Sequence, residues 1–254
     1  MKQLLTAITT LLCVYTMAQT QVLDSKVYTY AAAKPADKSA NTKAVFSGSG
    51  AILALHQLNA NLVNIGAAVS FKAGSKYERF IIVQQGMLRV NFKGVTKNLE
   101  RGSVLFLMPN EEAFLENSSG AQAIFYMMQY QPKTASIVDS VKRTESGFML
   151  DWKDIKFKAS EKGGVRQYFD IQTPMLHRFD IHVTQLNPGL KSHDPHTHKN
   201  EEIILMLDGN GVMQIGENQQ ACGPNDAVFL NSMVLHNITN TGTVPALYFA
   251  IQWN

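Results

Sequence analysis

The stretch GLKSHDPHTHKNEEIILMLDG, residues 189–209, crowds imidazoles and carboxylates immediately before an apolar run. It holds three of the chain's seven histidines, among them His196 and His198, and Glu202 follows them closely. Successive side chains of an extended segment point to opposite faces, so these three residues share one face if the segment is extended throughout. Residues two apart on a strand lie about 7 Å from each other, near enough for two imidazoles to reach one ion, whereas on a helix they diverge. The spacing therefore predicts a metal site carried by a strand.

A fourth ligand is available in LNSMVLHNITN, residues 230–240, where His236 begins a second predicted strand that can return beside the first. Three neutral imidazoles and one carboxylate suit a divalent transition metal, namely Mn, Fe, Co, Ni or Zn, and exclude the all-oxygen cage of a calcium site. Four protein ligands leave a position open for chemistry if the ion is five- or six-coordinate. The sequence predicts one such ion held by His196, His198, Glu202 and His236.

The chain also repeats itself. Residues 43–130 match residues 166–253 without a gap at an offset of 123 positions, mainly in the apolar pattern and in turn residues such as Gly66 with Gly189 and Gly86 with Gly209. In the first copy the four ligand positions are occupied by residues that cannot hold an ion together: Ala73, Ser75, Arg79 and Ala113. The turn glycines persist while all four ligands are missing, so we expect one retained metal site and one lost site.

Both copies consist of short, β-rich segments separated by Gly, Asn and Asp, which predicts a β barrel or sandwich in each half. In the second half the predicted strands are 179–186, 201–207, 211–216, 226–231 and 246–253. The DGNG sequence at 208–211 predicts a hairpin turn, because Asn and Gly tolerate positive φ. A short helix is an option only around 134–145, between the copies.

The ligand spacing resembles the first motif of the cupins, G-x5-H-x-H-x3,4-E-x6-G. This chain places six, one, three and six residues between Gly189, His196, His198, Glu202 and Gly209. The cupins' second motif ends H-x3-N, which His236 and Asn240 match, although the usual proline and glycine before that histidine are absent.

The resemblance implies an all-β chain of two tandem cupin barrels, each a double-stranded β-helix or jelly roll, with the metal in the mouth of the second. Together with the repeat and the first residues, it gives the expected organisation: a signal peptide (1–18), an N-terminal arm (19–42), a barrel without metal ligands (43–130), a linker (131–160) and a metal-binding barrel (161–254). Tandem cupins with one metal site are similar to the ureidoglycine aminohydrolases. Those enzymes use Glu, His, His and Gln as ligands, so their activity does not carry over to this ligand set.

For function, the resemblance implies a metal-binding bicupin, and the first residues, discussed below, predict that it is exported. We expect a metal-dependent enzyme of hydrolase, isomerase or lyase type that acts on a small polar substrate such as a sugar acid, a ureide or another carboxylate. A non-catalytic bicupin that binds a small ligand or is structural, and an iron-dependent dioxygenase, are the alternatives. Cupins commonly pair through their sheets, so a homodimer is an option. No residue is singled out as catalytic.

Three further residues are candidates for contact with a substrate. His182 lies on the strand before the motif, and alternation alone does not say whether it lines the pocket or faces solvent. His193 could support the metal ligands or be a solvated loop residue. Arg166 could bind a substrate carboxylate or have a structural role. Glu201 is out of phase with the ligands and is expected on the outer face, and Cys222 is expected to be a packed small residue.

The composition is that of a soluble globular protein, with 45% hydrophobic residues and 23 Lys and Arg against 20 Asp and Glu. There is no basic run interleaved with aromatics, so nucleic acid is not an expected partner. The first residues, MKQLLTAITTLLCVYTMA, carry one charge and then an apolar stretch shorter than the ~20 residues of a spanning helix. They predict a cleaved signal peptide, a periplasmic or secreted protein and no stable membrane insertion.

Overall fold

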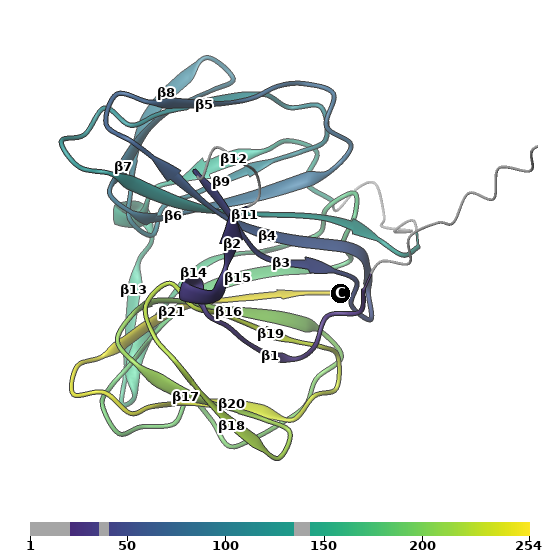
Figure 1. The fold of residues 1–254 in the computed structure, drawn as a ribbon, viewed down its shortest axis with the longest axis vertical. Helices are drawn as coiled ribbons and strands as arrows, with labels where there is room; N and C mark the ends of the chain where they lie inside the picture. Colours follow the sequence, from purple (N-terminus) through teal and green to yellow (C-terminus); the bar gives the residue numbers. More distant parts are fainter. Residues whose placement is uncertain (1–20, 36–40, 135–142) are drawn as a thin grey trace, which may run out of the picture.

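The computed structural model describes residues 21–35, 41–134 and 143–254, which form two β-barrels stacked one above the other (Figure 1). Within these ranges the only helical elements are two single 3-10 turns, η1 (Tyr30–Ala32) and η2 (Trp152–Asp154). None of the described segments is a helix long and apolar enough to cross a membrane. The predicted signal peptide and most of the predicted helix around 134–145 lie outside the described residues.

The first barrel, the upper one in Figure 1, is built from a seven-stranded and a four-stranded antiparallel sheet. The larger sheet has the order β12 (Phe148–Leu150), β9 (Val104–Leu107), β6 (Glu78–Gln85), β11 (Ala123–Pro132), β4 (Leu53–Val63), β3 (Thr42–Gly48), β2 (Lys34–Pro35). The smaller sheet has the order β5 (Ala68–Phe71), β10 (Ala113–Glu116), β7 (Met87–Phe92), β8 (Val95–Glu100). Apolar side chains from both sheets fill the space between them.

The second barrel repeats this plan with a seven-stranded and a three-stranded antiparallel sheet. The larger has the order β1 (Lys26–Tyr28), β19 (Ala227–Leu230), β16 (Glu201–Asp208), β21 (Ala246–Trp253), β15 (Phe179–Leu186), β14 (Gly163–Ile171), β13 (Phe157–Ser160). The smaller has the order β18 (Asn218–Cys222), β17 (Gly211–Ile215), β20 (His236–Asn240). The prediction of an all-β chain of two jelly-roll barrels is confirmed.

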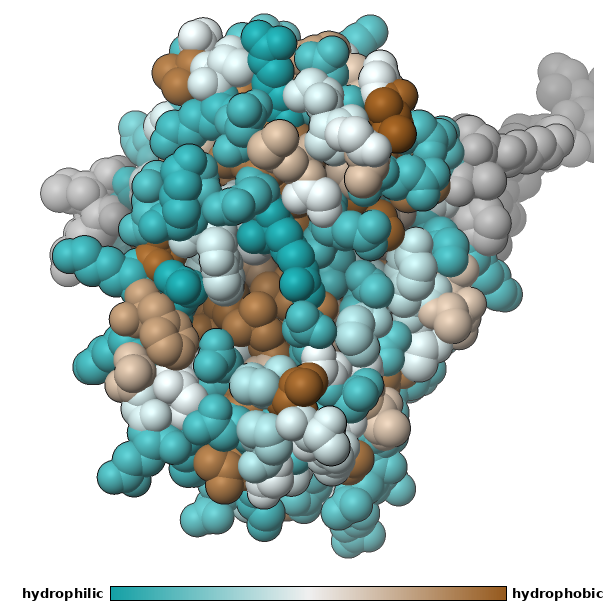
Figure 2. All heavy atoms as spheres, turned by 90° about the vertical axis from the view of Figure 1, so that its left-hand side faces the viewer, coloured by the Kyte–Doolittle hydropathy of each residue, from teal (hydrophilic) through white to brown (hydrophobic). Residues whose placement is uncertain are grey.

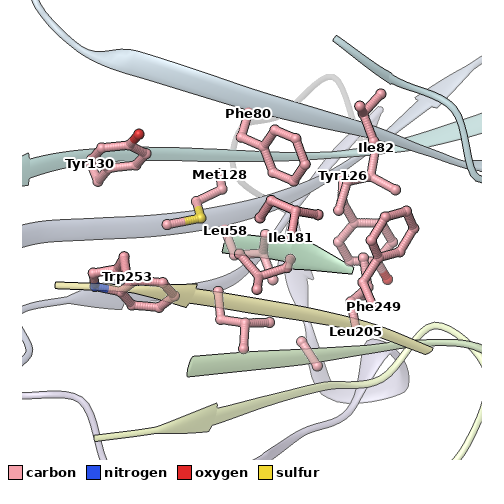
Figure 3. Packing of buried hydrophobic residues seen from close by; sticks show 14 of the residues in the cluster. Leu58, Phe80, Ile82, Tyr126, Met128, Tyr130, Ile181, Leu205, Phe249 and Trp253 are labelled. Atoms are coloured by element: carbon pink, nitrogen blue, oxygen red, sulfur yellow. The ribbon is translucent and has the colours of Figure 1, made fainter. Parts of the chain in front are cut away.

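The two large sheets pack face to face, and this contact is the main core of the molecule. A strand in such a sheet is covered on both faces, which explains why β16 reads as an almost unbroken apolar run, EEIILMLD, and is buried from Glu201 to Leu207. Figure 3 shows the interface from close by. Its labelled members are Leu58, Phe80, Ile82, Tyr126, Met128 and Tyr130 from the first barrel, and Ile181, Leu205, Phe249 and Trp253 from the second.

Each barrel lends an edge strand to the other. β1, which precedes the first barrel, pairs with β19 of the second, and β12, which precedes the second barrel, pairs with β9 of the first. The registers match: Lys26 lies opposite Phe229 and Phe148 lies opposite Phe106, and Phe106 and Phe229 are repeat counterparts. The structural repeat therefore extends beyond the residues in which the sequence repeat is visible.

Gly209 ends β16 with φ of 72°, and a Cβ there would lie 2.7–2.8 Å from the backbone of Pro245 and Ala246. Its repeat counterpart Gly86 has φ of 75°, and a Cβ there would lie 3.0–3.1 Å from the backbone of Gln122 and Ala123, a tight but less severe approach. Only glycine combines this conformation with this approach, which is why the turn glycines survive in both copies. The predicted DGNG turn therefore connects β16 to β17.

The surface seen from the left of Figure 1 is mostly polar, with apolar side chains gathered in a hollow near the middle of the face (Figure 2). The five strands predicted in the second half correspond to β15, β16, β17, β19 and β21, each within about one residue at either end. The strand β18, with the polar sequence NQQAC, was not predicted, because it lacks an apolar alternation.

Candidate metal centre

His196 and His236 face each other across an antiparallel bridge, with backbone N–H···O distances of 3.2 and 3.0 Å between them. The chain bends at Lys199 and Asn200 before β16 begins, so the condition of an extended segment throughout 196–202 is not met. The side chains nevertheless converge. The ligand atoms of His196, His198 and His236 all lie within 4.8 Å of one another.

Glu202 joins this group from the beginning of strand β16. Its Oε2 atom lies 3.1 Å from His198 Nε2 and 3.2 Å from His236 Nε2. Two ligand atoms each about 2.1 Å from one ion, at right angles, would be about 3 Å apart. The observed separations therefore fit neighbouring ligands of a single ion. The structure brings the four predicted ligands together, and their binding of an ion stays a prediction.

In His236 and His198, a hydrogen bond at Nδ1 orients the ring and so directs its Nε2 atom. His236 Nδ1 lies 2.8 Å from the carbonyl oxygen of Val234, and His198 Nδ1 lies 3.0 Å from that of Asn200. A neutral imidazole that donates from Nδ1 to a carbonyl leaves its Nε2 lone pair free. Both rings can therefore offer Nε2 to an ion in their neutral form.

Charge and burial favour the ligating form of the carboxylate. Burial alone would raise the pKa of Glu202, but its hydrogen bonds with His198 and His236 and the charges of those rings lower that pKa to about 2. The same contact raises the pKa of His198. Burial and the neighbouring imidazoles lower the pKa of His196. The site thus contains a carboxylate that stays ionised among imidazoles, a donor set suited to a divalent transition metal.

Three of the four residues, His196, Glu202 and His236, line a cavity of about 330 Å³ in the second barrel, and His198 contacts Glu202 beside it. Ile204, Met213, Ile238 and Ala250 supply apolar wall, and the side chains of both His182 and His193 line it as well. His193 Nδ1 lies 3.0 Å from His196 Nδ1, so His193 supports a predicted ligand directly.

His182 is among the residues that line the cavity, which agrees with the first of the two alternatives that the sequence left open. Its Nδ1 lies 3.9 Å from Asp180 Oδ1, and Gln167 donates to that oxygen at 2.7 Å. Arg178 holds the other Asp180 oxygen at 2.9 Å. Burial opposes ionisation of Asp180, but His182, Gln167 and Arg178 lower its pKa. An ionised carboxylate therefore lies next to the His182 ring, outside the cavity lining.

Arg166 lies outside the cavity. Its guanidinium stacks on Trp152, 4.4 Å from the ring centre, and on Phe157, and it donates to the carbonyl oxygen of Ile155. Of the two roles considered for Arg166, these contacts favour the structural one, in which its guanidinium packs on aromatic rings.

Glu201 points away from the ligands, as expected, but that outer face is covered by the first barrel. The side chain is fully buried and accepts hydrogen bonds from Trp253 Nε1, at 2.9 Å, and from the backbone N–H of Ala51. Its repeat counterpart Glu78 is also buried and accepts from Tyr130 and Thr173. Glu201 of the second barrel therefore binds the loop at Ala51 of the first, and Glu78 of the first binds the loop at Thr173 of the second. Strand alternation alone does not reveal this role.

The first barrel has no counterpart of this centre among the described residues. Arg79, at the position of Glu202, is buried, donates to the carbonyl oxygen of Glu111 and packs on Phe71. A guanidinium therefore stands where the second barrel has its carboxylate. In the part of the chain that the structure describes, His196, His198 and His236 form the one group of three His, Cys, Asp or Glu residues close enough to hold a metal.

Several polar cavity residues were not predicted from the sequence. Gln252 and Tyr248 project from β21, Asn237 lies beside His236, and Lys162 lies in the turn between β13 and β14. The even-numbered positions of β21 pair with those of β15 and β16, so cross-strand register could have indicated Gln252 and Tyr248. Lys162 has no such signal, because turn residues carry no periodicity.

Comparison with known proteins agrees with this architecture. Residues 182–252 match the family model of the cupin domain. The search of curated proteins gave no significant match. Among solved structures, protein Ylba from E. coli is similar over 94% of this chain and 95% of its own, with 16% identity and a TM-score of 0.68.

Two oxalate decarboxylases show the same fold. The enzyme from Lactobacillus farciminis, solved as a formate complex, is similar over 91% of this chain and 87% of its own, with 12% identity and a TM-score of 0.68. The enzyme from Bacillus subtilis, studied for its Mn(II) centres, is similar over 90% and 77%, with 11% identity and a TM-score of 0.66. At these identities the likeness establishes the fold alone. It shows no specific relationship to the ureidoglycine aminohydrolases.

Proposed function

We propose, from the premise that residues 182–252 form a cupin domain, that this chain is a metal-dependent enzyme acting on a small polar substrate in its second barrel. One observation carries the proposal: His196, His198, His236 and Glu202 converge at ion-ligand spacing, and His196, His236 and Glu202 line a cavity of about 330 Å³. A site with only structural metal would need no such adjoining space.

The donor set fits Mn, Fe, Co, Ni or Zn. When bound there, such an ion would polarise a substrate oxygen or lower the pKa of a water molecule. Two similar structures support this reading, since one oxalate decarboxylase contains Mn(II) centres and another was solved with formate. Their reaction is not transferred to this chain, because identity is 11% and 12%.

The chain's own residues supply proton transfer and orientation. His182 lines the cavity and is backed by the ionised Asp180, so it can take a proton from a substrate or return one. Thr184, Gln252 and Asn237 offer neutral hydrogen-bonding groups to substrate oxygens. Apolar wall from Ile204 and Met213 keeps part of the site free of competing water.

The proposal is tested by metal analysis of the purified protein, followed by assays on carbohydrate lactones, uronates, ureides and catechol-like compounds. Turnover by wild type that is lost in a folded His196→Ala variant supports the enzyme. Ligand binding without turnover would instead indicate a non-catalytic binding protein. Turnover that needs Fe and O2 would indicate a dioxygenase. Ser75→Ala, at the position of His198 in the first barrel, is the matched control and should retain full activity.

We further propose that the protein is exported. The support is the sequence of residues 1–18, with one lysine before an apolar stretch that ends Thr16-Met17-Ala18. Fractionation of cells expressing the full chain should find a shortened protein outside the cytoplasm. Removal of residues 1–18 should leave it inside, and full-length protein retained in the cytoplasm would contradict the proposal.

A further inference from the structure

The cavity of the second barrel has an unbalanced charge. Among its lining residues Glu202 is the one acid, and it is engaged with His198 and His236. A divalent ion at the proposed site would exceed the charge of that single carboxylate by one unit. Lys162 is the one lysine or arginine in the lining and adds a second positive charge. A loaded cavity would therefore attract an anion.

Lys162 is held at the rim by its backbone. It lies in the turn between β13 and β14, and its carbonyl oxygen accepts a hydrogen bond from the N–H of Asn187 at 2.8 Å. Gly163, the next residue, has φ of 133°, and a Cβ there would lie 2.2 Å from the carbonyl oxygen of Gln185. The close approach that glycine allows fixes this turn against β15, beside the cavity.

The side chain of Lys162 reaches across the rim toward the metal ligands. Its Nζ donates to the carbonyl oxygen of Ser192 at 3.0 Å, and Ser192 directly precedes His193, whose ring contacts His196. No carboxylate of the described residues lies within ion-pair distance of Lys162. Its ammonium group therefore keeps donors and charge available for a ligand in the cavity.

The size of the cavity limits the ligand. A volume of about 330 Å³ corresponds to roughly ten water molecules in the liquid, so the cavity encloses on the order of ten non-hydrogen atoms of a ligand. The remaining polar lining, including Thr184, Asn237 and Gln252, is uncharged. Such groups suit hydroxyl and carbonyl oxygens rather than a second strong charge.

We infer that the substrate is a small hydroxy- or oxo-carboxylate whose carboxylate is recognised by Lys162. The inference rests on the proposed function, because the second positive charge comes from the metal centre. Arg166 is the cationic candidate in the sequence, but it lies outside the cavity. Lys162 lines the cavity and is the cation that would bind a substrate carboxylate. A carboxylate substrate also explains why the cavity contains one acid only.

The test uses the protein without residues 1–18, loaded with Mn(II). Two matched probes are compared, glycolate and its neutral amide, glycolamide. Paramagnetic broadening of the probes' methylene protons, followed through a titration, gives each dissociation constant for binding near the metal. Wild type should bind glycolate about tenfold more tightly than glycolamide. Lys162→Gln should weaken glycolate binding about three- to tenfold, since an exposed ion pair is partly screened, and should leave glycolamide unchanged.

The control is Lys158→Gln, which removes the same charge from an exposed position of β13 that does not line the cavity. It should leave glycolate binding unchanged, and all variants should hold the same amount of Mn(II). Loaded wild type that binds both probes equally, or neither, would overturn the inference alone, as would equal losses in the two lysine variants. Wild type that takes up no Mn(II) would overturn the proposed function and the inference with it.

Discussion

Replacing His56 by phenylalanine should make the protein more resistant to acid. His56 is fully buried at the interface of the barrels, among the rings of Phe46, Phe229 and Trp253, at centroid distances of 5.1, 5.7 and 4.8 Å. Neither ring nitrogen has a hydrogen-bond partner among the described residues. Burial therefore lowers the pKa of His56 from its usual 6.5 to about 3. Its repeat counterpart is Phe179, so the fold already accepts phenylalanine at the equivalent place.

The sign follows from proton binding in the two states. The unfolded chain binds a proton at His56 below pH 6.5, whereas the folded chain binds it only near pH 3. Stability is therefore lost as the pH falls from 6.5 toward 3, by about 1.4 kcal/mol for each pH unit well inside that window. Between pH 7 and pH 5 the wild type should lose about 2 kcal/mol that the variant keeps.

The assay is urea-induced unfolding of wild type and His56→Phe at pH 7 and pH 5. The larger phenylalanine ring changes the packing equally at both pH values. The quantity to compare is therefore the change in the free energy of unfolding between pH 7 and pH 5, in wild type and in the variant. Burial raises the pKa of Glu78, which acts with the opposite sign but equally in both proteins. An equal change in stability between pH 7 and pH 5 for wild type and variant would refute the reasoning.

Three further predictions concern single residues. Glu201→Ala should destabilise the protein by about 1–3 kcal/mol in urea unfolding, because it leaves Trp253 Nε1 buried without an acceptor, whereas the Ala51 N–H keeps Asn231 Oδ1; metal content should not change, and metal loss from the folded variant would contradict this. Cys222 is buried and its pKa is raised to about 12, chiefly by burial, so a thiol reagent should react with it only after unfolding; rapid labelling of folded protein would contradict this. Gly209→Ala should lower the melting temperature more than Gly216→Ala, because both glycines have positive φ but only Gly209 has backbone within 3 Å of the added Cβ; equal losses would show that the contact is unimportant.

The sequence predicted the fold well because its strongest signals are local. Alternating apolar residues and the turn glycines Gly86 and Gly209 mark the strands and their ends, and the offset of 123 positions relates the two barrels. The ligand group could also be predicted, since His196, His198 and Glu202 are close in sequence. His236 required only that a later strand return beside them, which β20 does.

What the sequence could not predict depends on contacts between distant segments. Glu201 is on the outer face of its barrel, but only the packing of the two barrels shows that this face is buried from solvent. The exchange of β1 and β12 between barrels is equally invisible, because three-residue strands carry no pattern. Lys162 reaches the cavity only because a turn is fixed against β15, so the sequence offered Arg166 as the cationic candidate instead.

The most direct test of the central claim is the metal content of matched variants. Purified wild type, His198→Ala and Ser75→Ala are each incubated with Mn(II) or Zn(II), freed of excess ion and analysed by inductively coupled plasma mass spectrometry, with circular dichroism to check folding. About one ion per chain is expected in wild type and in Ser75→Ala, and most of it should be lost in His198→Ala, because His198 contributes one of the four ligands. Folded wild type without metal, or equal losses from both variants, would contradict a single centre in the second barrel.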